Sequence, residues 1–322
     1  MTITETPPGS SPAANTPVSE RTSKLGDRIF GGLSLGAGVL ILVTLAAVAL
    51  FLLTEGWAAF TADSSEFSDE QGVFEYVGPL LFGTVWAAIL ALLLAMPLAV
   101  GVALYISHYA PKRLAQTLGY FVDLLAAIPS VVFGLWGIAV LAPILSRSVF
   151  PWLEDNLGFI PLFDGPASTS GRTMMTAAVV LAVMILPIIT AISREVFLQT
   201  PRLHEEASLA LGATKWEMIR QAVIPYGRSG VISGAMLGLG RALGETMAVA
   251  MILSPADIFS FDIISNQNPN TIAANIALKF PESAGLDVNR LIATGLVLFA
   301  LTFFVNALAR RIANAGFSGA AG

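Results

Sequence analysis

Long apolar runs alternate with short polar segments along most of this chain. Each run has close to or more than the roughly 20 residues that a helix needs to cross a bilayer. The runs occupy residues 29–53, 81–106, 117–141, 173–196, 231–253 and 291–308. Because backbone amides inside lipid find no water, the pattern predicts an all-α integral membrane protein with six transmembrane helices. Pro97, Pro129 and Pro187 fall inside these runs, where we expect them to kink the helices.

The composition supports this class and speaks against several others. Hydrophobic residues make up 55% of the 322 residues and charged residues only 12%, whereas soluble domains carry about 25% charged residues. The chain has no cysteine, which excludes disulfides and thiolate chemistry. Its only imidazoles, His108 and His204, are far apart in the sequence, so no zinc site is expected.

The charges between the apolar runs are sorted by sign. Basic residues gather before the first run and in the segments 112–113, 194–228 and 310–311, whereas the other loops are mainly acidic. Because basic loops face the cytoplasm, we expect both termini to be cytoplasmic. The first run is too long for a usual signal peptide, so we expect a retained helix. The predicted organisation is a disordered tail (1–24), a first helix with its outer loop (25–78), a helical core (79–312) and a cytoplasmic tail (313–322).

The basic loop between the fourth and fifth runs reads "PRLHEEASLALGATKWEMIRQAVIPYG" over residues 201–227. A helical stretch over 203–211 should end at Gly212, because glycine readily terminates helices. A second amphipathic stretch over 216–223 should stop at Pro225. The loop therefore predicts two short helices joined at a glycine and projecting into the cytoplasm. The alternative is an ordinary amphipathic loop that lies on the lipid headgroups.

The stretch "EASLALGATKWEMIRQAVIP" resembles the EAA loop of bacterial ABC importer permeases. A glutamate is followed at fixed offsets by a glycine and a proline, as in that family's pattern. The resemblance implies the fold of a type I ABC importer permease (MetI-like) and a helix that docks on a separate ATPase subunit. The residues it assigns to this coupling are Glu205, Glu206, Ala207, Gly212 and Ala213. No G-x-x-x-x-G-K-[ST] loop is present, so we expect ATP and Mg²⁺ to bind partner subunits and no cofactor to bind this chain.

Two opposite charges interrupt the fifth apolar run, in "GLGRALGETMAVA". A charge at the middle of a membrane helix costs roughly 2.5–3.5 kcal/mol on insertion scales, so such residues are seldom idle. Arg241 and Glu245 are four residues apart, which predicts one face of one continuous helix. They form either a structural ion pair or part of a transport path, in which Arg241 suits a tetrahedral oxyanion. Ser130 and Thr246 are further candidate donors in this path, although such hydroxyls more often bond backbone carbonyls.

The segment "GRALGETMAV" also resembles the signature of the phosphate-specific ABC permeases, and is closer to the PstC-type subunits than to their PstA-type partners. "LLAAIPSVVFGLWGI" over 124–138 resembles a second segment of that family. The resemblance implies a phosphate permease in the bacterial cell membrane. Its partners would be a second permease, two ATPase subunits and an extracytoplasmic phosphate-binding protein, with no nucleic acid.

Three alternatives remain open from the sequence. Within the transporter class, the chain could serve another oxyanion such as sulfate, molybdate or phosphonate, since the EAA-like loop does not separate these substrates. An intramembrane enzyme would need a nucleophile–base pair or a metal set within the spans, and neither histidine lies there. A purely structural subunit would explain the small-residue ridges at Gly230, Gly234 and Gly238. It would not explain the EAA-like loop together with a buried arginine.

Overall fold

The computed structural model describes residues 24–315, so most of the tail expected over 1–24 and all but the first residues of the tail expected over 313–322 lie outside the described residues. The chain forms two compact units, residues 1–50 and 51–322. The described part of the first unit is the beginning of helix α1 (Lys24–Thr61), whose apolar side chains there are almost all exposed. Such a helix needs lipid or another protein around it.

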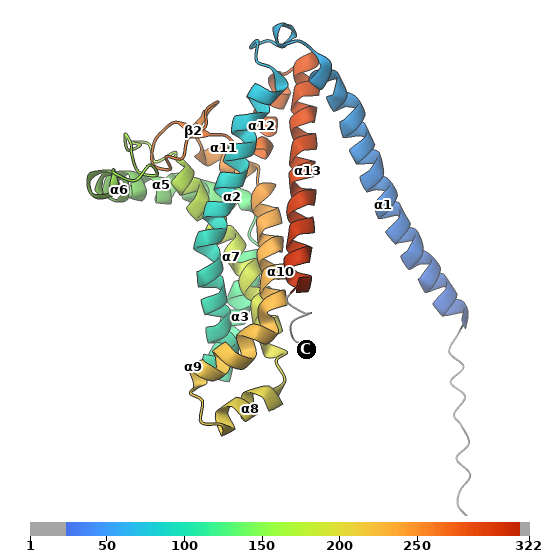
Figure 1. Cartoon of the computed structure of the whole chain (residues 1–322), viewed down its shortest axis with the longest axis vertical. Coiled ribbons are helices and arrows are strands. Elements are labelled where there is room, and N and C mark those ends of the chain that lie inside the picture. Colours follow the sequence, from blue (N-terminus) through green and yellow to red (C-terminus); the bar gives the residue numbers. More distant parts are fainter. Residues whose placement is uncertain (1–23, 316–322) are drawn as a thin grey trace, which may run out of the picture. The chain divides into compact units, whose positions relative to one another are not determined.

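Four further long helices build the second unit: α2 (Val73–Leu104), α7 (Met174–Leu198), α10 (Ile224–Leu243) and α13 (Leu286–Ala315). Figure 1 shows α2, α7 and α10 running side by side, and α7 packs most extensively against both of the others. A row of alanines at every fourth position of α2 is fully buried and lets α7 approach closely: Ala87, Ala91, Ala95, Ala99 and Ala103. Pro97 and Pro187 lie inside α2 and α7, which continue past them.

Shorter elements connect these helices. Between α1 and α7 in the sequence, apart from α2, they are η1 (Ser64–Glu66), the π turn η2 (Tyr105–Tyr109), α3 (Lys112–Ala126), α4 (Ser130–Trp136), η3 (Gly137–Leu141), α5 (Ala142–Ile144), η4 (Leu145–Val149) and α6 (Phe150–Leu157). After α7 they are α8 (Arg202–Ala210), α9 (Lys215–Met218), η5 (Ile219–Val223), α11 (Met247–Ile252), β1 (Pro255–Ala256), β2 (Asn268–Pro269), α12 (Ile272–Lys279) and η6 (Phe280–Glu282). The strands β1 and β2 form one short parallel pair.

Among the described residues, five helices are long and apolar enough to cross a membrane: 26–61, 73–109, 130–157, 174–198 and 286–311. The first, second, fourth and sixth expected spans are confirmed as helices of that kind. The third and fifth expected spans, 117–141 and 231–253, are wrong as continuous helices, because each is interrupted.

The first interruption lies at residues 127–129, between α3 and α4. We expected Pro129 to kink a continuous helix, but the helix ends before it. A proline has no N–H to donate and its ring disfavours helical geometry at the preceding residue, here Ile128. A new helix then starts at Ser130, directly after the proline.

The second interruption lies at residues 244–246, between α10 and α11. Gly244 ends α10, and the carboxylate of Glu245 accepts a hydrogen bond from the backbone N–H of Ala248 at 3.1 Å. A side chain that takes a backbone N–H starts a new helix at the expense of continuing the old one.

The cytoplasmic loop largely follows its expected pattern. Helix α8 ends before Gly212, whose φ of +87° is the left-handed conformation typical of a helix terminator. The expected stop at Pro225 is wrong, since α9, η5 and α10 run on without a gap. The π turn re-registers the backbone there, with the Ile224 N–H donating to the Ile219 carbonyl. Pro225, which has no N–H, is thus accommodated next to a π bulge.

At the opposite end of the unit, a buried arginine ties three segments together. Arg290 on α13 donates to both carboxylate oxygens of Asp69, at 2.6 and 3.0 Å, and to Asp287 at 3.2 Å. Its guanidinium carbon lies 4.7 Å from the ring centre of Phe67 and 4.1 Å from that of Tyr76. This arrangement fastens the loop after α1 to the first turns of α2 and α13.

Candidate functional site

The two interruptions lie near each other in space. Helix α4 packs on α11 so closely that a Cβ added to Gly134 would lie 2.9 Å from the Cα of Ala248. Ser130 is four residues from Gly134, and Glu245 is three residues from Ala248. Both breaks therefore lie about one helical turn from the same contact. The fold brings together the two segments that carry Ser130 and the charged pair.

The ion pair between Arg241 and Glu245, one of the two readings of the sequence, is not formed. Glu245 lies beyond the end of α10, so the two residues do not share one helical face as a continuous helix would require. Glu245 is only 8% exposed and its carboxylate caps α11. Among the described residues, no ion pair involves Arg241, which is partly buried in the last turn of α10. That position is favourable for a cation because helix carbonyls end there.

Arg172 holds the other end of α11, a role that the sequence did not predict. Its guanidinium Nη2 donates to the carbonyl of Leu253, the residue that ends α11, at 3.2 Å. The short helix therefore has a carboxylate at its N-terminus and a guanidinium at its C-terminus, the signs that stabilise a helix dipole. Arg172 was conspicuous only as one of the few basic residues in the acidic loops.

The two candidate hydroxyls differ in what they contact. The Thr246 hydroxyl donates to the Gly244 carbonyl at 3.1 Å, as hydroxyls in membrane helices commonly do. Ser130 starts α4 and is partly exposed, and its hydroxyl has no hydrogen bond among the described residues. Of the two, Ser130 is the one with a free hydroxyl.

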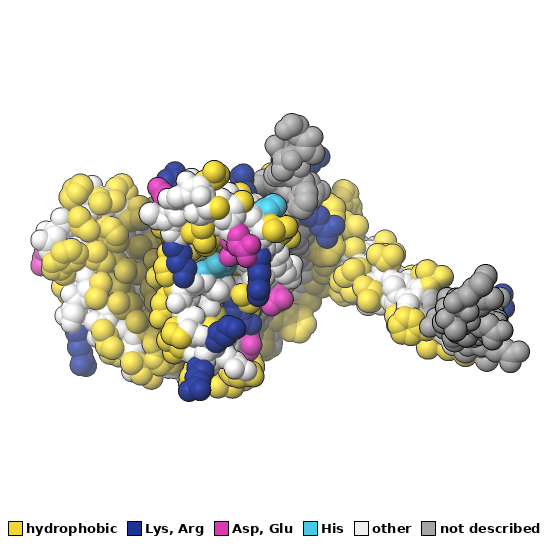
Figure 2. Space-filling view, turned by 90° about the horizontal axis from the view of Figure 1, so that it is seen from below, with side chains coloured by type: hydrophobic (Ala, Val, Ile, Leu, Met, Phe, Trp, Pro, Cys, Tyr) yellow, Lys and Arg dark blue, Asp and Glu magenta, His cyan; other side chains and the backbone are white. Residues whose placement is uncertain are grey.

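Helix α8 presents the expected coupling residues at the cytoplasmic end. Glu206, Ala207 and Gly212 are exposed and Ala213 is partly exposed, whereas Glu205 turns back toward His108. Leu203 is 76% exposed and Leu211 90% exposed, and α8 contains no buried residue. Figure 2 looks onto the lower end of Figure 1, where basic, acidic and histidine side chains gather around apolar ones. Apolar side chains exposed outside the membrane favour a protein partner.

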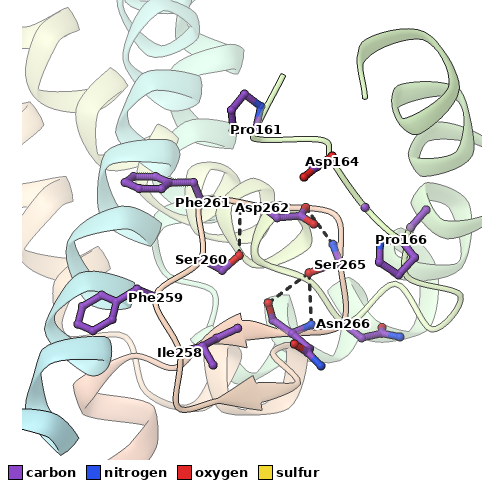
Figure 3. A pocket seen from close by; sticks show the side chains of 13 residues that line it. Pro161, Asp164, Pro166, Ile258, Phe259, Ser260, Phe261, Asp262, Ser265 and Asn266 are labelled. Atoms are coloured by element: carbon purple, nitrogen blue, oxygen red, sulfur yellow. Dashed lines mark hydrogen bonds between the residues drawn. The ribbon is translucent and has the colours of Figure 1, made fainter. Parts of the chain in front are cut away.

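A pocket of about 630 Å³ opens at the other end of the second unit. Figure 3 shows Asp164 and Asp262 among its walls, with Phe259 and Phe261 on the side of α2. Phe261 packs edge-on against Phe82 and Trp86 of α2, which fixes this loop to the helix bundle. The Asp262 carboxylate accepts from the backbone N–H groups of Ile264 and Ser265, and among the described residues Asp164 has no hydrogen bond or ion pair. The pocket thus pairs aromatic side chains with negative charge.

The fold and the site define a permease of the ABC importer class. The chain has membrane-length helices, and two of the expected spans break near each other. Two short helices are exposed on the basic face. The chain belongs to the family described as "Binding-protein-dependent transport system inner membrane component", whose model matches residues 95–315. It is therefore a multi-pass membrane protein with the expected importer-permease fold.

Named relatives agree along nearly the whole chain. It is 45% identical over 317 residues to "Phosphate transport system permease protein PstC 2" of Mycobacterium tuberculosis, covering 94% of this chain and 96% of that protein. It is 40% identical over 300 residues to "Phosphate transport system permease protein PstC" of Mesorhizobium japonicum, covering 90% of each. A crystal structure of a bacterial ABC transporter involved in alginate import shares the fold, with a TM-score of 0.51 and 18% identity over 89% of this chain and 99% of that chain.

Proposed function

We propose that this chain is a permease subunit of an ATP-driven importer of inorganic phosphate. The proposal is supported by relatives named as phosphate transport system permease proteins, which this chain matches over nearly their full length. The observation that carries it within the chain is the unpaired Arg241 beside the break between α10 and α11. Discontinuous membrane helices are characteristic of transporter substrate sites, because the break leaves polar backbone groups for the substrate.

In this proposal Arg241 provides a permanent, fork-shaped donor to the phosphate oxygens. Glu245 uses one carboxylate oxygen to cap α11, and its second oxygen accepts the O–H of a protonated phosphate. A fully ionised sulfate has no O–H to donate and is repelled by the carboxylate. Ser130 and Thr246 stand at the starts of α4 and α11 beside this position. Binding here is weak, since a path that holds its ion tightly cannot release it.

We further propose the partners of this chain. A second permease completes the path, and two ATPase subunits carry ATP and Mg²⁺. They engage α8 through Glu206 and Ala207 and the turn after it through Gly212 and Ala213, so that rocking of the two permeases follows the movement of the ATPases. An extracytoplasmic phosphate-binding protein docks at the outer end, where the pocket with Asp164 and Asp262 offers negative charge to a basic side chain.

The first experiment compares Arg241→Gln and Arg241→Lys with wild type in the reconstituted complex with its binding protein and ATPase subunits. Phosphate uptake and binding-protein-stimulated ATP hydrolysis are recorded together. We expect Arg241→Gln to assemble and hydrolyse ATP while uptake falls at least about 10-fold, and Arg241→Lys to retain part of the uptake, because loss of a charge-assisted hydrogen bond costs roughly 1.5–3 kcal/mol. Uptake at the wild-type rate in Arg241→Gln would show that Arg241 lies off the path. Failure of assembly in both variants would assign it a structural role.

A further inference from the structure

The cytoplasmic end of α2 contacts both short helices of the coupling loop. The helix finishes in the π turn η2, which carries Ser107, His108 and Tyr109 side by side. His108 Nε2 lies 3.5 Å from a carboxylate oxygen of Glu205 on α8, and the ammonium of Lys215 on α9 lies 4.8 Å from the ring centre of Tyr109. Two adjacent residues of one membrane helix therefore reach the two halves of the loop.

The His108 side chain is more buried than that of Glu205 and has a second polar contact. The His108 side chain is only 8% exposed, and its Nδ1 lies 2.7 Å from the Ser107 hydroxyl, which orients the ring. Nε2 is thereby left to face Glu205, whose side chain is 25% exposed. The imidazole is thus held on the membrane helix by a second contact of its own, and the carboxylate is its partner on the coupling helix.

Helix α8 has little else to hold it in one orientation. It contains no buried residue, and its closest neighbours are η5 and α9, in its own loop. Gly212, just after its end, has a left-handed φ and open space around it, so the backbone can rotate there and α8 can change its orientation. A helix that transmits force needs a contact with the element that it moves.

We propose that His108 is a positioning residue that joins coupling helix α8 to α2, so that the two helices move as one body during transport. The inference rests on the proposed function, because it assumes that an ATPase acts on α8. It assigns different roles to the adjacent residues Glu205 and Glu206. Glu206 faces outward to the ATPase, and Glu205 faces inward to the membrane helix.

The first test measures the coupling ratio, that is, the substrate imported for each ATP hydrolysed by the reconstituted complex. His108→Leu removes the contact, and His108→Gln keeps an N–H donor toward Glu205. We expect His108→Leu to lower the ratio about two- to fivefold, the range that a partly exposed polar pair supports. His108→Gln should restore most of it. His204→Gln is the matched control, since His204 is exposed on α8, the helix that carries Glu205, and its side chain has no hydrogen bond or ion pair among the described residues.

The second test replaces the contact by a covalent link. This chain contains no cysteine, so a His108→Cys/Glu205→Cys pair introduces the only thiols of this chain that a short bifunctional thiol reagent can join. If α8 and α2 move together, the cross-linked pair imports substrate at a higher coupling ratio than the same pair before cross-linking. The two single-cysteine variants, treated identically, control for modification alone.

Two results would overturn the inference. One is loss of import on cross-linking, which would mean that α8 and α2 must separate during the cycle. The other is a coupling ratio in His108→Leu equal to that of wild type. The ratio is read with whichever oxyanion the wild-type complex imports, so a failure of phosphate as the substrate leaves this test intact.

Discussion

Glu245 and Ala248 are joined by a hydrogen bond of 3.1 Å, from the Ala248 backbone N–H to the Glu245 carboxylate. This bond turns a residue that resembles half of a membrane ion pair into the cap of a new helix. The new helix begins directly after α10, which ends at Leu243 and carries Arg241 in its last turn. The charged pair and the interruption are one feature, because the carboxylate makes the break and the break leaves the arginine without its expected partner.

The capping role predicts different effects for two substitutions of Glu245. Glu245→Ala removes the acceptor and should destabilise the protein by about 0.5–2 kcal/mol, the usual cost of losing a helix cap. Glu245→Gln keeps an acceptor oxygen and should retain most of the stability. Thermal unfolding of the purified complex measures both. Equal destabilisation by the two variants would mean that the charge, and not the cap, matters there.

The close approach of α4 and α11 predicts that residue 134 tolerates no side chain. The Cβ of Gly134→Ala would lie 2.9 Å from the Cα of Ala248, so the helices must separate, at a cost of about 1–3 kcal/mol. Transport should fall as well, because the two breaks would move apart. Gly101→Ala is the control, since a Cβ there meets nothing within 4 Å. Unfolding temperature and phosphate uptake are compared, and equal values for the two variants would argue against tight packing at Gly134.

The salt bridge at Arg290 predicts a pH dependence on the outer side. Burial alone would raise the pKa of Asp69, but the hydrogen bonds from Arg290 and Gln71 outweigh it and hold this pKa below its ordinary value of 3.8. A depressed pKa contributes stability above the unfolded-state value, and this contribution is lost as the pH falls through the folded-state value.

We therefore expect Arg290→Gln to be clearly less stable than wild type at pH 7, and the difference to narrow below about pH 3.8. Thermal unfolding between pH 3 and pH 7 measures the gap. Asp69→Asn serves as the control and should show the same narrowing, since it removes the titrating partner. A gap that stays constant with pH would assign the effect to lost packing against Phe67 and Tyr76.

The outer pocket predicts a salt-dependent effect on docking. Asp164→Asn should raise the concentration of binding protein needed for half-maximal ATPase stimulation, by about two- to fivefold at low salt, because a charge at an interface rim steers association. Raising the ionic strength should shrink the difference between variant and wild type. Asp155→Asn is the matched control, because Asp155 is an exposed acid on α6 that does not line the pocket. Identical stimulation curves for Asp164→Asn and wild type would remove this pocket from the docking surface.

The sequence by itself determined the elements that depend on local composition. Apolar run length was enough to predict α1, α2, α7 and α13, and the glycine at 212 was enough to end α8, because burial in lipid and left-handed backbone are properties of a segment alone. Only the tertiary structure decided that the breaks in the two spans lie near each other, that Arg172 holds the end of α11, and which way Glu205 and Glu206 face. Those outcomes depend on contacts between residues far apart in the chain, such as Arg172 with Leu253 and His108 with Glu205. Spacing within one helix carries no information about such contacts, and the four-residue spacing of Arg241 and Glu245 likewise could not show that Glu245 caps α11 instead.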